Sequence, residues 1–319
     1  MFKQTFEPFA EEMWITAVQV ATVWTNPESA REIDNSGTEN PTDIDKWIAD
    51  LSYEESLSLC DENRVQTQLL YGEPVIVTET TVDGTWANVV IPTQPSNKDG
   101  RGYPGWVPLK QLRRMKKSDW TSEKSAAVMK DNTWLAAANG DQLIKLSYMT
   151  ILPVVNEHRK RIEVKTPHGN NYLPREAVKV FPNDKGRDPG NGEAIVKAGE
   201  AYAGLDYFWG GMSNFGYDCS GLAYALHKAN GYRIARDAGD QAKSGKSVDY
   251  DKLLPGDLLF FAYEEGKGRL HHVGIFYGEG KMLHSPQTGK GIEIIELAGT
   301  KYEKELCAAR RYWHDAGEK

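Results

Sequence analysis

The chain lacks the features of a membrane or nucleic-acid-binding protein. No apolar run approaches the roughly 20 residues that cross a bilayer, so no membrane insertion is expected. Of 319 residues, 38 are Lys or Arg and 45 are Asp or Glu, and the net charge of -7 argues against nucleic acid as the main partner. Hydrophobic residues make up 40% of the chain, which is enough for packed cores and excludes wholesale disorder.

Cysteine is scarce. Cys60, Cys219 and Cys307 are an odd number of thiols far apart in the chain, so they do not form a disulfide framework, and their use suits a reducing compartment. The first eight residues contain no apolar segment typical of a secretory signal. We therefore expect a cytoplasmic protein, and the alternative is a secreted protein whose signal was removed.

Signals for metal and phosphate sites are also missing. There is no HExxH motif, no paired cysteine spacing and no phosphate-binding glycine loop, so neither a metal nor a cofactor is expected. Cys60 and Cys307 are interpreted as packed small hydrophobic residues. We expect His227 to lie on the exposed side of a helix.

The N-terminal third has the pattern of a small β-barrel. Alternating residues predict a half-buried strand over 15–23, and further strands are expected at 74–78, 85–91 and 105–108, separated by Gly-containing turns. Residues 27–62 have helical periodicity and a capped helix start after Pro41, which indicates a helical insertion. The predicted domain spans residues 10–116. The basic run at 113–117 is expected to edge a surface strand or linker.

A weak internal repeat predicts a second barrel at residues 117–183. The sequence LPREAV at 173–178 echoes VPLKQL at 107–112, each a strand that runs into a short helical turn. Both segments resemble bacterial SH3-like domains. The alternative is unrelated β segments that share turn chemistry.

A charged segment rich in Gly and Pro, residues 183–192, predicts a linker to a third domain at 191–319. Helices are expected at 193–202 and 220–229, followed by strands at 257–261, 272–277, 281–284 and 291–295. Helices followed by a run of strands is an α+β order.

Cys219 is the candidate nucleophile. It directly precedes a predicted helix, where free backbone amides and the helix dipole would stabilise a thiolate. His272 and His284 occupy the start and end of two predicted strands joined by a turn, so an antiparallel hairpin would place them side by side. His271 competes with His272 as the base, and strand alternation alone does not choose between them. The alternative is a helix cap with a cysteine beside it by chance.

These residues resemble the NlpC-type cysteine peptidases of bacterial cell-wall metabolism, which have a compact papain-like fold. The motifs, in the order of the family, are YFWGG at 207–211, DCSG at 218–221, LPGDL at 254–258, HVGI at 272–275 and HSP at 284–286. The resemblance covers residues 191–313. It implies His272 as the base and His284 as the third catalytic residue beside Cys219.

Two barrels before this domain resemble the subgroup of γ-D-glutamyl-L-diamino-acid endopeptidases. That resemblance implies that a free L-alanine amine is read by acidic and tyrosine side chains, and it implies Tyr207 as an oxyanion donor. The matching substrate-binding positions are Glu73, Tyr103, Tyr207, Asp218 and Ser220. The alternatives are an exposed turn residue for Glu73 and a barrel aromatic for Tyr103.

The expected activity is hydrolysis of the γ-D-glutamyl-L-diamino acid bond of a murein tripeptide or tetrapeptide with a free N-terminal L-alanine, without a cofactor. One alternative is a secreted hydrolase of intact wall whose barrels bind peptidoglycan. Others are a non-catalytic peptide-binding module, or a transferase or amidase that uses the same thioester chemistry.

Overall fold

The structure, a computed structural model, describes residues 11–314 and divides the chain into two compact units. One unit holds the chain up to Thr93, Lys98–Gly186 and Ser213–Phe215, and the other holds Gln94–Asn97, Arg187–Met212 and the chain from Gly216. The main division therefore falls inside the predicted linker at 183–192. The finer domain boundaries stay predictions.

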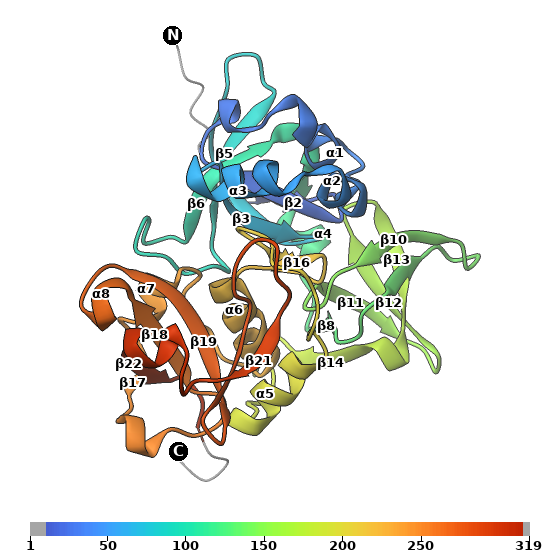
Figure 1. The fold of residues 1–319 in the computed structure, drawn as a ribbon. Helices are drawn as coiled ribbons and strands as arrows, with labels where there is room; N and C mark the ends of the chain where they lie inside the picture. Colours follow the sequence, from blue (N-terminus) through green and yellow to red (C-terminus); the bar gives the residue numbers. More distant parts are fainter. Residues whose placement is uncertain (1–10, 315–319) are drawn as a thin grey trace. The chain divides into compact units, whose positions relative to one another are not determined.

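The first unit contains two antiparallel seven-stranded sheets (Figure 1). The first has the order β3-β2-β6-β5-β4-β1-β7, and the second has the order β10-β9-β13-β12-β11-β8-β14. The strands of the first are β1 (Glu12–Thr16), β2 (Val20–Trp24), β3 (Val65–Leu70), β4 (Pro74–Thr80), β5 (Trp86–Ile91), β6 (Tyr103–Pro108) and β7 (Leu112–Lys116). Those of the second are β8 (Lys124–Val128), β9 (Thr133–Ala136), β10 (Gln142–Leu146), β11 (Ile151–Glu157), β12 (Arg161–Thr166), β13 (Gly169–Pro174) and β14 (Val178–Pro182).

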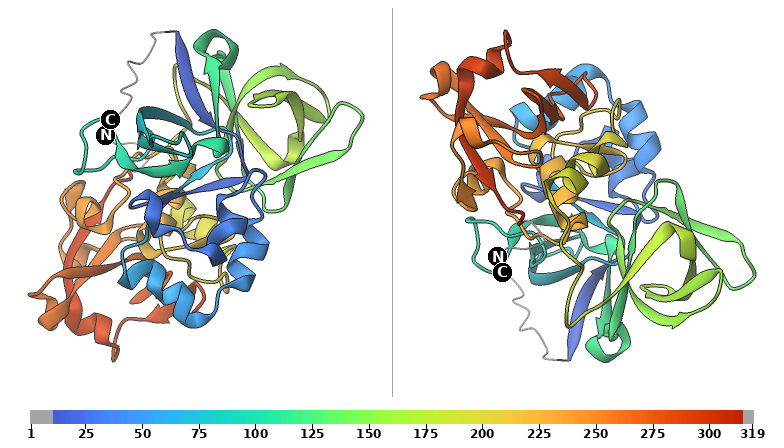
Figure 2. Two further views of the ribbon diagram at one scale, coloured as in Figure 1. Left: turned by 90° about the horizontal axis from the view of Figure 1, so that it is seen from above. Right: turned by 90° about the horizontal axis from the view of Figure 1, so that it is seen from below.

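The two sheets are copies of one topology, because adding seven to each strand number of the first order gives the second order. A 3-10 turn follows the corresponding strand in each copy, at Leu109–Gln111 and Arg175–Ala177. Figure 2 shows β8–β14, in green to yellow-green, curling into a barrel. The predicted internal repeat is confirmed.

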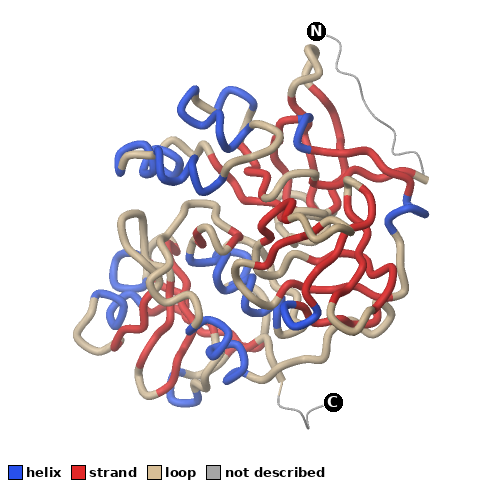
Figure 3. Tube along the Cα trace, turned by 90° about the vertical axis from the view of Figure 1, so that its right-hand side faces the viewer, coloured by secondary structure: helices blue, strands red, loops and turns tan. Residues whose placement is uncertain are grey.

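The predicted helical insertion lies between β2 and β3 and is visible as blue segments in Figure 3. It contains α1 (Asn35–Thr38), α2 (Ile44–Asp50) and α3 (Tyr53–Asp61). The side chain of Asp43 caps α2 by accepting from the amide of Lys46 at 3.0 Å. Trp47 of α2 is fully buried, and its indole N–H donates to Asp34 at 2.9 Å. The ring of Trp47 also lies 5.9 Å from that of Trp24 on β2, so this side chain packs the insertion against the barrel.

The prediction of one half-buried strand at 15–23 is wrong. The segment forms the end of β1 and most of β2, with a break at residues 17–19. Apart from Gln19, every residue from Ile15 to Trp24 is buried, so there is no exposed face. Alternation indicates a half-buried strand only where one face meets water, and here both faces are covered.

Side chains of the first barrel contribute to the hydrophobic core of the second. Ile15 and Tyr71 of the first barrel pack into the core of the second, together with Trp120 of α4 (Lys117–Trp120), which follows β7. The hydroxyl of Tyr71 lies 2.9 Å from Nδ1 of His168, and the side-chain amide of Gln19 donates to Lys145 O at 2.7 Å. The first barrel therefore cannot move away from the second without exposing apolar surface.

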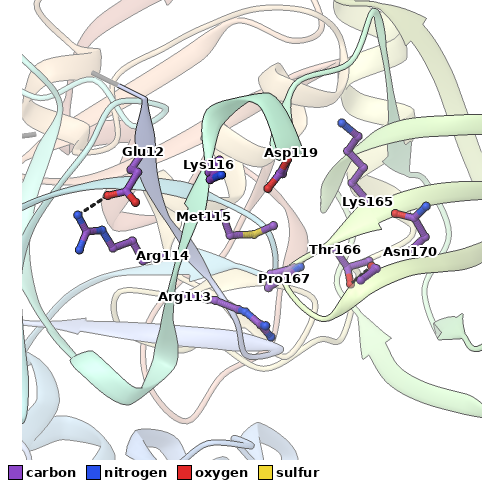
Figure 4. Close-up of a pocket in the computed structure, with 11 residues that line it drawn as sticks. Glu12, Arg113, Arg114, Met115, Lys116, Asp119, Lys165, Thr166, Pro167 and Asn170 are labelled. Carbon is purple, nitrogen blue, oxygen red and sulfur yellow. Dashed lines mark hydrogen bonds and ion pairs between the residues drawn. The ribbon is translucent and has the colours of Figure 1, made fainter. Parts of the chain in front are cut away.

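A groove of about 530 Å³ opens at the seam between the barrels (Figure 4). Arg113 of β7 and Lys165 of β12 line it from opposite sides, whereas Arg114 points toward Glu12 and pairs with it. Since β7 is the last strand of its sheet, the expectation that the basic run edges a surface strand is confirmed.

The second unit contains a six-stranded antiparallel sheet in the order β17-β22-β18-β19-β20-β21. Its strands are β17 (Lys246–Ser247), β18 (Leu258–Ala262), β19 (Leu270–Gly278), β20 (Lys281–His284), β21 (Glu293–Glu296) and β22 (Leu306–Arg311). Two short strands form a sheet of their own, β15 (Met212–Ser213), where the division between the units falls, and β16 (Gly216–Tyr217). The helices are α5 (Gly192–Glu200), α6 (Cys219–Ala229), α7 (Ala238–Gln241), α8 (Tyr263–Gly266) and α9 (Lys301–Glu305). Figure 1 shows α6 beside β19, which it contacts.

The expectation for His227 is wrong, because this residue is fully buried. All residues of α6 from Ser220 to His227 are buried, so the helix is enclosed on every side. Nδ1 of His227 lies 2.8 Å from Ala223 O, and burial lowers the pKa of His227 to about 4. The imidazole is therefore neutral at pH 7.

Within the described part of the chain, no helix is both long and apolar enough to span a bilayer.

Gly72 tests the packing between the two barrels. Its φ is +80°, and a Cβ there would lie 2.5 Å from Cδ2 of Leu152, a buried residue of the second barrel. We expect Gly72→Ala to lower the free energy of unfolding by about 3 kcal/mol, from backbone strain and overpacking together.

Gly84→Ala is the matched control, since Gly84 has φ +70° and no atom within 4 Å of the added Cβ. It should cost only the strain, about 1 kcal/mol. Urea denaturation measures both values, and equal losses would contradict a tight seam at Gly72.

Candidate active site

Cys219 is the first residue of α6, and only Asp218 separates it from the buried strand β16 (Gly216–Tyr217). Asp218 caps the helix by accepting from the amide of Gly221 at 2.6 Å. Cys219 keeps partial exposure, whereas its neighbours Asp218 and Ser220 are buried. The local sequence therefore holds a thiol at a helix N-terminus with access from outside.

The two predicted histidines meet as the hairpin argument requires. β19 and β20 are antiparallel with Ile275 opposite Leu283, which brings His272 and His284 to the same end of the sheet. Nε2 of His272 lies 2.8 Å from Nδ1 of His284, with the ring planes at 78°. Both residues are buried. Because His272 uses Nε2 for this bond, Nδ1 is the nitrogen left to serve as a base.

The backbone places Cys219 beside this pair. The amide of Val273, the residue after His272, hydrogen-bonds to the sulfur of Cys219. The structure thus brings together Cys219, His272 and His284, the three residues predicted as catalytic. Their chemical roles stay predictions.

His271 faces a different environment. Its ring stacks on Tyr263 with centroids 4.1 Å apart, and its Nε2 lies 3.2 Å from a carboxylate oxygen of Glu305. Neither contact involves Cys219 or His284. The geometry favours His272 as the partner of the thiol, in agreement with the assignment that the family resemblance implied.

In the free protein, burial favours the uncharged forms of Cys219, His272 and His284. Burial and, to a smaller extent, the negative charge of Asp218 raise the pKa of the Cys219 thiol to about 12. The hydrogen bond from the Val273 amide and the positive charge of Arg236 act in the opposite direction and lower it. Burial also lowers the pKa of His272 well below its usual value, with a smaller contribution from His284, and lowers that of His284 to about 4. Desolvation therefore opposes the thiolate that the helix end is expected to stabilise, and the charge state of Cys219 stays a prediction.

Asp218 and Ser220 belong to a buried polar cluster around Arg236. The guanidinium of Arg236 donates to both oxygens of Asp218, at 2.7 and 3.1 Å, and to Oγ of Ser220 at 2.8 Å. The amide of Gly210 donates to Asp218 at 3.0 Å. Arg236 is itself 1% exposed. A substrate amine at Asp218 would have to share a carboxylate that is already paired, and the substrate-binding role of Asp218 and Ser220 stays a prediction.

Arg236 and Tyr302 are the residues that sequence reasoning missed. The ring centroid of Tyr302, on α9, lies 5.2 Å from those of both His272 and His284 and 5.0 Å from that of Phe261. No motif contains Tyr302. Arg236 follows two apolar residues and offers no signal except that a buried arginine needs a carboxylate partner.

Glu73 and Tyr103 lie in the first unit, and both are buried. The carboxylate of Glu73 accepts from the amide of Leu70 at 3.0 Å and from the hydroxyl of Thr93. Tyr103 belongs to the core of the first barrel, and its hydroxyl accepts from Lys98. Glu73 is therefore not the exposed turn residue of the alternative interpretation, and its substrate-binding role and that of Tyr103 stay predictions.

Tyr207 is connected to the nucleophile through the backbone. It forms a parallel β-bridge with Tyr217, two residues before Cys219, and its amide donates to Lys290 O at 2.9 Å. Its role as an oxyanion donor stays a prediction.

The remaining thiols lie elsewhere. Cys60 is in α3, and Cys307 of β22 donates its S–H to Phe260 O at 3.3 Å. Between residues 11 and 314, no group of three or more His, Cys, Asp or Glu side chains is arranged to hold a metal ion.

Three family models match the chain. Residues 204–311 match the NlpC/P60 family, residues 61–112 match the bacterial dipeptidyl-peptidase SH3 domain, and residues 128–181 match the YKFC SH3b2 domain. The chain is 47% identical over 293 residues to the gamma-D-glutamyl-L-lysine dipeptidyl-peptidase of Bacillus subtilis (strain 168), a match that covers 92% of this chain and 96% of that protein. The chain belongs to the NlpC/P60 family of cysteine peptidases.

Two further relatives support this assignment. A gamma-D-glutamyl-L-lysine dipeptidyl-peptidase of Bacillus cereus (strain ATCC 10987 / NRS 248) is 36% identical over 299 residues, covering 92% of this chain and 89% of that protein. The crystal structure of an NlpC/P60 family protein from Bacillus cereus ATCC 10987 has a TM-score of 0.89 and 34% identity, and it covers 95% of this chain and 100% of that chain. The predicted fold class, an NlpC-type catalytic domain preceded by two SH3-like barrels, is confirmed.

Tyr302 supplies a test of the site geometry. Its ring packs against both imidazoles, so Tyr302→Leu should loosen their orientation and lower kcat/KM for peptide hydrolysis about tenfold. Tyr302→Phe keeps the ring and should stay within about twofold of the wild type.

Tyr263→Leu is the control, since Tyr263 stacks on His271 and contacts neither member of the pair. Steady-state kinetics of the three variants give kcat/KM for each and test whether Tyr302 positions the two histidines. If Tyr302→Leu and Tyr263→Leu behave alike, the ring of Tyr302 does not position the pair.

Proposed function

We propose that this enzyme hydrolyses the γ-D-glutamyl-L-diamino acid bond of murein peptides that carry a free N-terminal L-alanine. The observation that carries the proposal is the extent of the similarity to the Bacillus subtilis gamma-D-glutamyl-L-lysine dipeptidyl-peptidase, which covers 96% of that protein. A general wall hydrolase would need to share only the catalytic domain. Both barrels and the catalytic domain are shared here.

The chemistry follows from the site. The thiol of Cys219 attacks the γ-carbonyl of D-glutamate as Nδ1 of His272 takes its proton, and the imidazolium then protonates the leaving amine of the diamino acid. Water hydrolyses the resulting thioester, with His272 again as base. His284, 2.8 Å from Nε2, holds the ring of His272 in place during both steps.

The oxyanion formed in each step needs donors. The amide of Cys219 lies at the N-terminus of α6, where backbone amides have no partner within the helix. We assign it as one donor and the hydroxyl of Tyr207 as the second.

Recognition of the free amine is assigned to Glu73, Tyr103 and Asp218. The carboxylate of Glu73 is buried and accepts from the hydroxyl of Thr93. A buried ammonium requires a carboxylate, and Glu73 is one of the few buried carboxylates of the first unit.

Cleavage of small peptides predicts a cytoplasmic enzyme that acts on released fragments, whereas action on intact wall would favour the secreted alternative. A zymogram with purified peptidoglycan and fractionation of the source cells separate the two. Clearing of the wall would overturn the proposal that the enzyme acts on released fragments.

The decisive experiment is mass spectrometry of L-Ala-γ-D-Glu-L-Lys and its diaminopimelate counterpart, each with a free or an acetylated amino terminus. We expect cleavage at the γ-D-glutamyl bond only for the free amines, loss of turnover in Cys219→Ala, and a decrease of at least about 100-fold in Glu73→Gln for the free peptides.

Cys307→Ala is the matched thiol control and should keep full activity, because Cys307 lies on β22 with its S–H bound to Phe260 O. Cleavage of acetylated peptides at the same rate would refute the amine-recognition role. No cleavage of either form would refute the proposed function.

A further inference from the structure

His284 has an acidic neighbour that no motif contains. Nε2 of His284 lies 3.4 Å from Oε1 of Glu293, and this nitrogen is buried with no hydrogen-bond partner among the described residues. Glu293 is the first residue of β21 and stands directly opposite His284 of β20 in the antiparallel register. The pairing is therefore set by the backbone.

We propose that Glu293 is a positioning residue that fixes the protonation pattern of the two histidines. A carboxylate only accepts hydrogen bonds, so it favours a proton on Nε2 of His284. Nδ1 of neutral His284 then has to accept, which makes Nε2 of His272 the donor across the 2.8 Å contact. Neutral His272 is consequently unprotonated at Nδ1, and this nitrogen can take the proton of Cys219.

The opposite pattern would disable the base. If Nδ1 of His284 carried the proton, it would donate to Nε2 of His272, and neutral His272 would hold its own proton on Nδ1. The ring could not then accept from the thiol. The hydrogen bond between the imidazoles can form in either protonation pattern, so a third group is needed to favour one of them. The contact between Glu293 and Nε2 of His284 places Glu293 where it can do this.

The charge of Glu293 also helps after proton transfer. Once His272 is an imidazolium, its Nε2–H bond to His284 is strengthened, and a carboxylate beyond His284 stabilises the positive charge. Since the side chain of Glu293 is 42% exposed, solvent screens part of this effect. We therefore expect about a tenfold effect on kcat rather than a complete loss.

Other titratable groups also face His284. They are His272 from β19, Lys290 from the loop before β21, and Lys301 and Tyr302 from α9. Both lysines disfavour a positive charge on His284, which leaves Glu293 as the acidic group in contact with it.

The first arm of the experiment needs no substrate. Nitrogen-15 NMR of the histidine rings should show both His272 and His284 protonated at Nε2 in the wild type. Glu293→Met, which has no carboxylate, should shift both rings toward the Nδ1 form. An Nδ1-protonated His284 in the wild type, or unchanged spectra in Glu293→Met, would overturn the proposal.

The second arm rests on the proposed function and uses the free tripeptide. Glu293→Met should lower kcat about tenfold with little change in KM and should alter the pH profile of kcat. Glu293→Gln keeps an acceptor oxygen and should recover part of the loss.

Glu296→Met is the matched control. Glu296 lies on the same strand, pairs with Lys281 at 3.6 Å, and should leave kcat and the histidine spectra unchanged. An equal loss in both variants would mean that the effect comes from the strand as a whole. If the tripeptide is not cleaved at all, the proposed function fails while the NMR arm still decides the role of Glu293.

Discussion

The bond between the buried imidazoles of His272 and His284 is the contact on which the site depends. It exists because β19 and β20 are antiparallel neighbours, with both histidines at the same end of the sheet. The same strand carries Val273, whose amide meets the sulfur of Cys219 at the start of α6. Helix α6 is enclosed on every side, so the thiol has a fixed position relative to the sheet.

Burial has an electrostatic consequence. Both histidines and the thiol are desolvated, which favours the uncharged form of each group. In the proposed mechanism the reaction then begins with a neutral thiol and a neutral imidazole, and the proton moves when the substrate is attacked. The protonation pattern of His272 before that moment decides whether it can act.

The sequence reveals much of this site because its information is local. A cysteine before a predicted helix and two histidines on a predicted hairpin are recognisable from their spacing. The similarity of LPREAV to VPLKQL predicted two barrels of one topology. The choice between His271 and His272 needed the family resemblance. The two rings are not equivalent in the structure, because His271 contacts Tyr263 and Glu305 whereas His272 contacts His284.

What the sequence could not reveal depends on contacts between distant segments. Arg236 meets Asp218 across 18 residues, and Tyr302 reaches the histidines from α9. His227 followed the helical period as an exposed residue, but all residues of α6 from Ser220 to His227 are buried. The segment at 15–23 alternates like one half-buried strand, but it belongs to two strands and is covered on both faces.

The measurement that tests the neutral resting site most directly is the pH dependence of Cys219 alkylation by iodoacetamide, in a chain with Cys60→Ser and Cys307→Ser so that one thiol reacts. A neutral thiol with a raised pKa should react slowly at pH 6 and faster at each step through pH 9, without a plateau. A rate that is already maximal below pH 6 would indicate a thiolate–imidazolium pair and contradict the account.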